Sequence, residues 1–181
     1  MHILMCNDDG ILADGLRQLA TYLSQYYRVT VVAPATEQSA KSHALTTEIP
    51  LKLDAYNGED ENPRLYALTG TPSDCMKFGL SYLLADDMPD LVISGINHGF
   101  NLGSDVLYSG TVSAAMESAF YGIPGLALSV ERYSIERGYE MHPFIHELIE
   151  KIYVNSNFEG LLNVNFPLRG ICDWDHFKLV S

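Results

Sequence analysis

Two adjacent carboxylates, Asp8 and Asp9, directly follow an apolar run at 2–6 (HILMC). Like charges repel each other, and removing them from water at the end of a buried strand is costly. A divalent cation beside the pair supplies the larger opposite charge and reverses this balance. Oxygen donors from Asp, Asn and Ser suit magnesium, manganese or calcium better than a thiolate-bound metal. The pattern therefore predicts an exchangeable divalent cation here, although NDDG alone is also typical of a turn that enters a helix.

Two further polar segments are candidates for the same site. The first, at 35–43, consists of small and polar residues and contains Ser39. The second, at 95–111, is rich in Asn, Gly and Ser, and is long for a simple connection. Its Asn97 and Asn101 are candidate ligands, and among these glycines they are also ordinary turn residues. Loops of this kind, held on a rigid sheet, often carry function.

The second polar segment ends in Ser109-Gly110-Thr111, just before apolar residues at helical spacing over 112–120. Such a tripeptide is by default a helix N-cap, and the amino terminus of a helix also attracts anions. An acidic pair that can bind a metal ion and a helix start that can bind an anion are both expected at one edge of the sheet. Together they favour a phosphate ligand. His98, in the same segment, is a candidate general acid or a residue that only fills space.

Other candidate ligands are weaker. His142 and His146 are four residues apart and can share one face of a helix, but Pro-Phe-Ile lies between them and the glutamate of an HExxH site is missing. Cys6 reads as a buried strand residue. We therefore do not expect these residues to bind a metal.

Strand-like and helix-like segments alternate along the chain, which predicts a doubly wound, mostly parallel α/β sheet. Strands are expected at 2–6, 28–34, 45–56, 65–68, 90–95, 125–130 and 161–166. Helices are expected after an Asp14 N-cap, after a Thr71 N-cap with Pro72 first, from 112, and around 143–153. In such sheets ligands bind outside the carboxyl ends of the strands. The three polar segments fall at such ends, so we expect them to converge.

Composition limits the function classes. With 181 residues and 47% hydrophobic content, the chain is expected to form one domain. A net charge of −12 argues against binding of nucleic acid polymers, which requires a basic face. Three widely separated cysteines suggest neither a disulfide framework nor a zinc site, so a cytoplasmic location is expected. No run reads as a signal peptide or a membrane span.

Several motifs resemble those of the survival protein SurE family of metal-dependent 5′/3′-nucleotidases. They are NDDGI at 7–11, VVAP at 31–34, GTPSDC at 70–75, SGIN at 94–97, VLYSGTVSAA at 106–115 and NVNFP at 163–167. The similarity is collinear over nearly the whole chain. It implies a Rossmann-like fold with helices on both faces of the sheet, and hydrolysis of nucleoside 5′- and 3′-monophosphates to nucleoside and phosphate.

The resemblance also implies roles for individual residues. One divalent cation, magnesium or manganese, would be held by Asp8, Asp9, Ser39 and Asn97, and the phosphate would lie among Asn97, Asn101, Ser109, Gly110 and Thr111. Such a metal activates water and polarises the phosphoryl group. Attack by this water with Asp8 or Asp9 as the base is favoured over a covalent aspartyl-phosphate. Family members also assemble as oligomers, so a homodimer or homotetramer is expected.

This chain departs from the family pattern in two places. Ala40 stands where many relatives have glycine, and the sequence stops at Ser181, so residues 1–181 are expected to form a single phosphatase domain without the family's distal C-terminal part. Two other classes stay open. A receiver-like switch module also has an acidic pair after its first strand, with Asp54 as its only candidate acceptor; a non-catalytic nucleotide-binding or metal-binding protein has the same fold.

Overall fold

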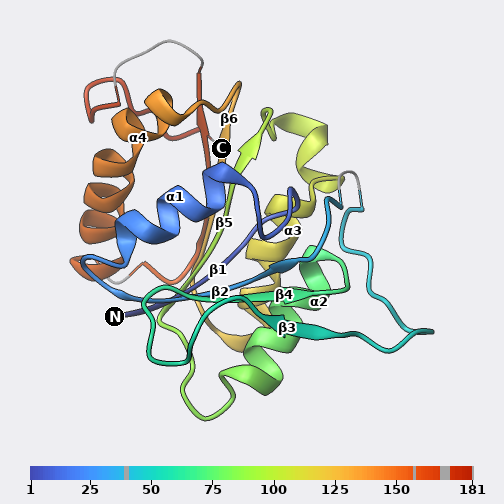
Figure 1. Cartoon of the computed structure of the whole chain (residues 1–181). Coiled ribbons are helices and arrows are strands. Elements are labelled where there is room, and N and C mark those ends of the chain that lie inside the picture. The colour runs from blue at the N-terminus through green and yellow to red at the C-terminus, as the bar shows by residue number, and fades with distance from the viewer. Residues whose placement is uncertain (39–40, 157, 168–171, 181) are drawn as a thin grey trace.

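The computed structural model describes residues 1–38, 41–156, 158–167 and 172–180. Its strands form one sheet in the order β3-β4-β2-β1-β5-β6-β7 (Figure 1). The strands are β1 His2–Cys6, β2 Arg28–Pro34, β3 Leu53–Ala55, β4 Arg64–Leu68, β5 Leu91–His98, β6 Gly125–Val130 and β7 Leu161–Phe166. All neighbouring strands are parallel except β3, which is antiparallel to β4. The prediction of a mostly parallel α/β sheet is confirmed.

Helices cover both faces of this sheet. The α-helices are α1 Asp14–Leu23, α2 Pro72–Phe78, α3 Gly110–Glu117 and α4 Ile135–Leu148, with π-helical turns at Gly79–Leu83 and Ile149–Val154 and 3₁₀ turns at Gly103–Leu107 and Ser118–Tyr121. Helices α1 and α4 pack together on one face, and α2 and α3 pack together on the other (Figure 1). None of the described helices is long and apolar enough to cross a membrane.

Apolar periodicity explains why these layers form. Every residue of β1 is buried, as parallel strands covered on both faces require. Helix α1 buries Leu16, Leu19 and Leu23, which recur at helical spacing, against the sheet. Full burial of a side chain of this size contributes about 2 kcal/mol. The central strands are therefore the rigid base from which the polar loops extend.

The predicted helix starts are partly correct. Thr71 caps α2, because its hydroxyl accepts from the Asp74 backbone N–H (3.1 Å) while the Asp74 carboxylate accepts from the Thr71 N–H (2.9 Å). The expected Asp14 N-cap is wrong. Ala13 occupies that position, and Asp14 is the first residue of α1, where a carboxylate still interacts favourably with the helix dipole.

Two predicted elements have other bounds. The second polar loop is shorter than expected because β5 continues to His98. Helix α4 starts at Ile135 rather than near Pro143, because the Ser134 side chain accepts from the Arg137 N–H and caps an earlier first turn.

The segment 45–56 forms a strand only at Leu53–Ala55. Thr46 instead donates from its N–H and its hydroxyl to Asp74 at the start of α2, at 3.0 and 2.7 Å. Side-chain bonds of this type compete with a strand ladder, so most of the segment is irregular.

Candidate active site

The turn after β1 presents the two carboxylates. Asn7 is wholly buried, and its side-chain amide donates to the Gly10 carbonyl while its amide oxygen accepts from the Gly10 N–H, both at 3.1 Å. These two bonds close the turn around Asp8 and Asp9. Asn7 therefore has a structural role in the NDDG motif, and Asp8 and Asp9 are its candidate functional residues.

Asp8 is held against the start of α3. Its carboxylate accepts from the Thr111 hydroxyl at 2.6 Å, and only 7% of the residue is exposed. A Cβ at Gly110 would lie 3.0 Å from the Asp8 side chain, so glycine lets the helix approach this closely. Ser109 caps α3 by accepting from the Val112 N–H (3.1 Å). The acid and the positive end of a helix dipole thus lie side by side.

Burial dominates the electrostatics of both acids. It raises the pKa of Asp8, although the Thr111 hydroxyl opposes this effect. Burial and the neighbouring Asp8 raise the pKa of Asp9 to about 6, and a hydrogen bond from the His98 backbone opposes this shift. Both carboxylates therefore bear a desolvation cost that a bound cation offsets. The buried Asp8 carboxylate and the half-buried Asp9 carboxylate, with an asparagine amide oxygen, form a donor set that fits a hard divalent cation.

The end of β5 brings Asn97 to the same edge. The pairing of β5 with β6 shifts register between Ser94 and Asn97, and Gly95 has a φ of +130°. A Cβ at Gly95 would collide with the Leu128 carbonyl oxygen, so the SGIN motif requires glycine at this position. The Asn97 side-chain amide donates to the Gly99 carbonyl (2.8 Å), an orientation that directs its nitrogen to the loop.

Asn101 is fixed by residues that sequence reasoning missed. Its side-chain amide donates to Ser129 Oγ (2.8 Å), and its backbone N–H donates to Asn165 Oδ1 (2.9 Å). The Asn163 and Asn165 side chains donate to the Asn101 carbonyl at 2.8 and 3.2 Å. Asn163 and Asn165 are two residues apart in β7, so their side chains lie on the same face of the sheet. This spacing was the sequence signal that could have identified them.

These elements surround a cavity of about 310 Å³. It is lined by Asp8, Asn97, His98, Asn101, Asp105, Tyr108, Ser109 and Gly110. Asp8 of the NDDG motif and the predicted residues of the second polar segment therefore converge, whereas no described residue of the first polar segment lines the cavity. Asp105 and Tyr108 are additions from the same loop. Thr111 and Asp9 are not among the lining residues; Thr111 acts on Asp8, and Asp9 is half-buried beside it. Ser39 lies outside the described residues.

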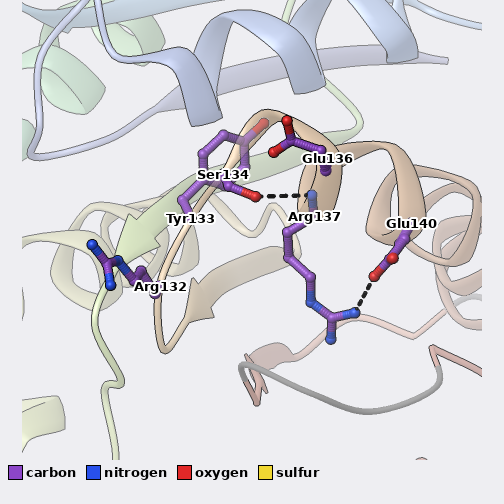
Figure 2. A pocket seen from close by; sticks show the side chains of 6 residues that line it. All are labelled: Arg132, Tyr133, Ser134, Glu136, Arg137 and Glu140. Atoms are coloured by element: carbon purple, nitrogen blue, oxygen red, sulfur yellow. Dashed lines mark hydrogen bonds and ion pairs between the residues drawn. The ribbon is translucent and has the colours of Figure 1, made fainter.

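A second hollow of about 240 Å³ lies at the start of α4, where Arg132, Tyr133, Ser134, Glu136, Arg137 and Glu140 line it (Figure 2). Its charges are two arginines and two glutamates, and Arg137 pairs with Glu140 at 2.6 Å. Figure 2 shows this pair together with the Ser134 cap of Arg137. These contacts are those of an ordinary helix start, so the cavity beside α3 is the better candidate site.

The two helical histidines are not arranged as a metal site. His142 is buried against Tyr22, with ring centroids 5.4 Å apart, while His146 stacks on Tyr26 at 4.0 Å. Within the described ranges, no group of three or more His, Cys, Asp or Glu residues is arranged to hold a metal. A metal ion held by Asp8 and Asp9 would therefore need asparagine or other oxygen donors as further ligands.

Residues 3–180 match the family model described as survival protein SurE. The chain belongs to the SurE family. It is 49% identical over 168 residues to the 5′-nucleotidase SurE of Thermoanaerobacter pseudethanolicus, covering 92% of this chain and 66% of the relative. It is 50% identical over 174 residues to the 5′-nucleotidase SurE of Thermosipho africanus, covering 92% of this chain and 65% of the relative.

Structural comparison agrees with this family membership. The crystal structure of the SurE protein from Aquifex aeolicus matches with a TM-score of 0.79 and 39% identity, covering 92% of this chain and 66% of that one. The chain therefore spans about two thirds of the length of the SurE relatives that it matches.

Proposed function

We propose that this chain is a metal-dependent phosphomonoesterase that hydrolyses nucleoside 5′- and 3′-monophosphates. Relatives that are named 5′-nucleotidase SurE support the nucleotide substrate. The observation that carries the proposal is the contact between Asp8 and the start of α3, where Thr111 Oγ1 donates to Asp8 Oδ1 at 2.6 Å. This contact joins a candidate metal-binding acid to a helix amino terminus that binds anions.

One divalent cation, magnesium or manganese, fits the donor set of Asp8, Asp9 and Asn97, with Ser39 proposed as a further ligand. When bound, such a cation lowers the pKa of a water molecule and neutralises charge on the phosphoryl group. No Lys or Arg is among the described residues that line the cavity. This composition supports a bound metal ion as the source of positive charge at the phosphate.

The chain's own groups take the remaining roles. We assign the backbone N–H groups at Ser109-Gly110-Thr111 and the amide of Asn101 to the phosphate oxygens, where they stabilise the charge that develops in the transition state. Asp8, fixed by Thr111, and Asp9 are the candidate bases for the attacking water. His98 is exposed at the cavity and is the candidate proton donor to the leaving oxygen.

Neither alternative class gains support. In a receiver, the acceptor acid must face the acidic pair. Asp54 instead lies on the edge strand β3, pairs with Lys52 at 2.8 Å, and is not among the residues that line the cavity. A non-catalytic nucleotide-binding protein differs from the proposed enzyme only in releasing no phosphate, so a turnover measurement is needed to distinguish the two.

Phosphate release tests the proposal. Purified protein is incubated with a panel of 5′- and 3′-nucleoside monophosphates, first with manganese or magnesium and then with a chelator. We expect turnover that stops with chelator and returns with added metal. Asp8→Asn should lose at least about 100-fold in kcat, while the matched control Asp54→Asn keeps normal turnover. A folded wild-type protein that binds metal and releases no phosphate would contradict the proposal.

The proposal extends to the organisation of the protein. Residues 1–181 act as one phosphatase domain, and the chain assembles as a homodimer or homotetramer without binding nucleic acid polymers. The three free cysteines, Cys6, Cys75 and Cys172, support a reducing, cytoplasmic location. Light scattering on the purified protein tests the oligomeric state.

A further inference from the structure

A contact between His43 and the buried Glu117 lies at the far end of α3 from the candidate site. Glu117 is the last residue of α3 and is 5% exposed, and its Oε2 lies 2.6 Å from His43 Nε2. The His43 side chain is 35% exposed and lies beside the Phe120 ring, with centroids 6.3 Å apart. A buried carboxylate is costly unless it is paired, so this contact fixes His43 firmly to the helix.

The contact is part of a longer attachment. Ser42 donates from its hydroxyl to the Leu107 carbonyl (2.9 Å), and Ser113 donates from its hydroxyl to the Ser42 carbonyl (3.0 Å). Further along, Thr71 donates to the Ala44 carbonyl at 2.6 Å. The segment 41–46 is therefore bound first to α3 and then to the start of α2.

The same stretch of chain leads away from the acidic pair. The Gln38 backbone N–H donates to the Asp8 carbonyl at 2.8 Å. The described residues on both sides of positions 39–40 are thus anchored, at Gln38 on Asp8 and at Ser42 and His43 on α3. Helix α3 contacts Asp8 through Thr111 in its first turn and His43 through Glu117 in its last turn. One helix therefore contacts both Asp8 and the segment 41–46.

We propose that the His43–Glu117 pair is a positioning contact for binding of the divalent cation. It holds segment 41–46 on α3, the helix whose Thr111 binds the Asp8 carboxylate, while the Gln38 N–H binds the Asp8 carbonyl. His43 lies outside the cavity lining and touches neither substrate nor metal in this role. The inference rests on the metal site of the proposed function.

Manganese affinity is the direct test, measured by electron paramagnetic resonance of free Mn²⁺ on the full chain without nucleotide. We expect His43→Ala to weaken Mn²⁺ binding about tenfold, the scale typical of residues that orient metal ligands. His43→Gln retains a donor for Glu117 and should recover most of the affinity. His146→Ala is the matched control, because His146 on α4 also pairs with a glutamate, Glu150 of the following π-helical turn, at 3.9 Å.

A second readout follows the segment itself. Lys41 is exposed next to His43, so trypsin cleavage after Lys41 reports how tightly 41–46 is held. We expect faster cleavage in His43→Ala than in His146→Ala, and stronger protection by Mn²⁺ in wild type than in His43→Ala. At saturating metal, the KM for nucleotide should change less than about twofold, which separates this role from general damage to the site.

If His43→Ala fails to fold because Glu117 is left unpaired, the double variant His43→Ala/Glu117→Gln removes that buried charge and is measured instead. Wild-type Mn²⁺ affinity in either folded variant would overturn the positioning role. A wild-type protein that binds Mn²⁺ but releases no phosphate would contradict the phosphatase proposal and leave the positioning role intact. A wild-type protein that does not bind Mn²⁺ would overturn both.

Discussion

The two neighbouring acids have different surroundings. Asp8 is nearly fully buried, accepts from Thr111 and lies against Gly110, whereas Asp9 is half-buried and receives a bond from the His98 backbone. A single fixed carboxylate beside a more exposed one suits a site in which one ligand is held in place and the other adjusts as metal and substrate enter. Variants of the two residues should therefore differ in stability as well as activity.

Thr111→Val tests how Asp8 is fixed. Valine has nearly the same volume but cannot donate to the Asp8 carboxylate, so the buried acid loses a partner. We expect a loss of about 1–3 kcal/mol in the free energy of unfolding, measured with urea, together with reduced phosphate release. Thr21→Val, at an exposed position of α1, is the control. Unchanged stability in Thr111→Val would show that the hydroxyl does not support Asp8.

Asp9→Asn tests the metal ligand set. The side chain keeps its size, so the fold should survive without a cavity, while most phosphate release is lost. Saturating Mn²⁺ should raise the Tm of wild type, because a ligand that binds only the folded state stabilises it, and should raise the Tm of Asp9→Asn much less. Near-normal phosphate release by a metal-bound Asp9→Asn protein would show that the proposed site is wrong.

At the scale of elements, strand positions follow well from sequence because β-branched and apolar runs such as RVTVVAP mark buried strands directly. Helix starts are less predictable because several residues compete to cap them. Asp14 looks like an N-cap, yet Ala13 takes that place, and Ser134 starts α4 well before the apolar pattern becomes clear. The irregular course of 45–52 depends on Thr46 and Asp74, which are far apart in sequence and whose contact no local pattern reveals.

The interface between α1 and α4 should make stability depend on pH. Burial against Tyr22 lowers the pKa of His142 to about 4, and no described protein atom hydrogen-bonds its Nε2. The neutral form is thus favoured in the folded state, so stability is fully present above the unfolded pKa of about 6.5 and is lost as pH falls towards 4.

His142→Phe should flatten this dependence. Unfolding by urea between about pH 7 and pH 4.5 would measure it, with an expected wild-type loss on the order of 1–3 kcal/mol from this residue. Phe keeps the ring packing on Tyr22 but cannot be protonated. An equally steep loss in His142→Phe would assign the acid sensitivity to other groups.

At the scale of the whole molecule, the acidic charge affects substrate capture. The net charge of −12 repels a phosphate dianion as it approaches, and salt screens this repulsion. Raising NaCl from about 20 to about 150 mM should therefore lower the KM for a nucleoside monophosphate by about twofold at saturating metal. Replacing chloride by acetate controls for specific ion effects. A KM that rises with salt would indicate a locally positive approach path.

The candidate site was predictable where its residues lie at strand ends and unpredictable where its contacts depend on the order of the strands. Asp8, Asn101 and the start of α3 follow strands, and Asn97 lies at the carboxyl end of β5, so a parallel sheet brings them together. The supports for Asn101 from Ser129, Asn163 and Asn165 depend on the order of β5, β6 and β7, which the sequence alone does not determine.

The position of β7 affects when the protein can become active during synthesis. All the proposed donors and phosphate-binding groups have been translated once Thr111 is in the chain, yet Asn101 is braced by Asn163 and Asn165 on a strand made some fifty residues later. A nascent chain still on the ribosome would carry every reactive group without the support that aligns Asn101. Competence of the proposed site would then begin only when β7 docks, so a chain that has not yet added this strand would carry the donors without an aligned Asn101.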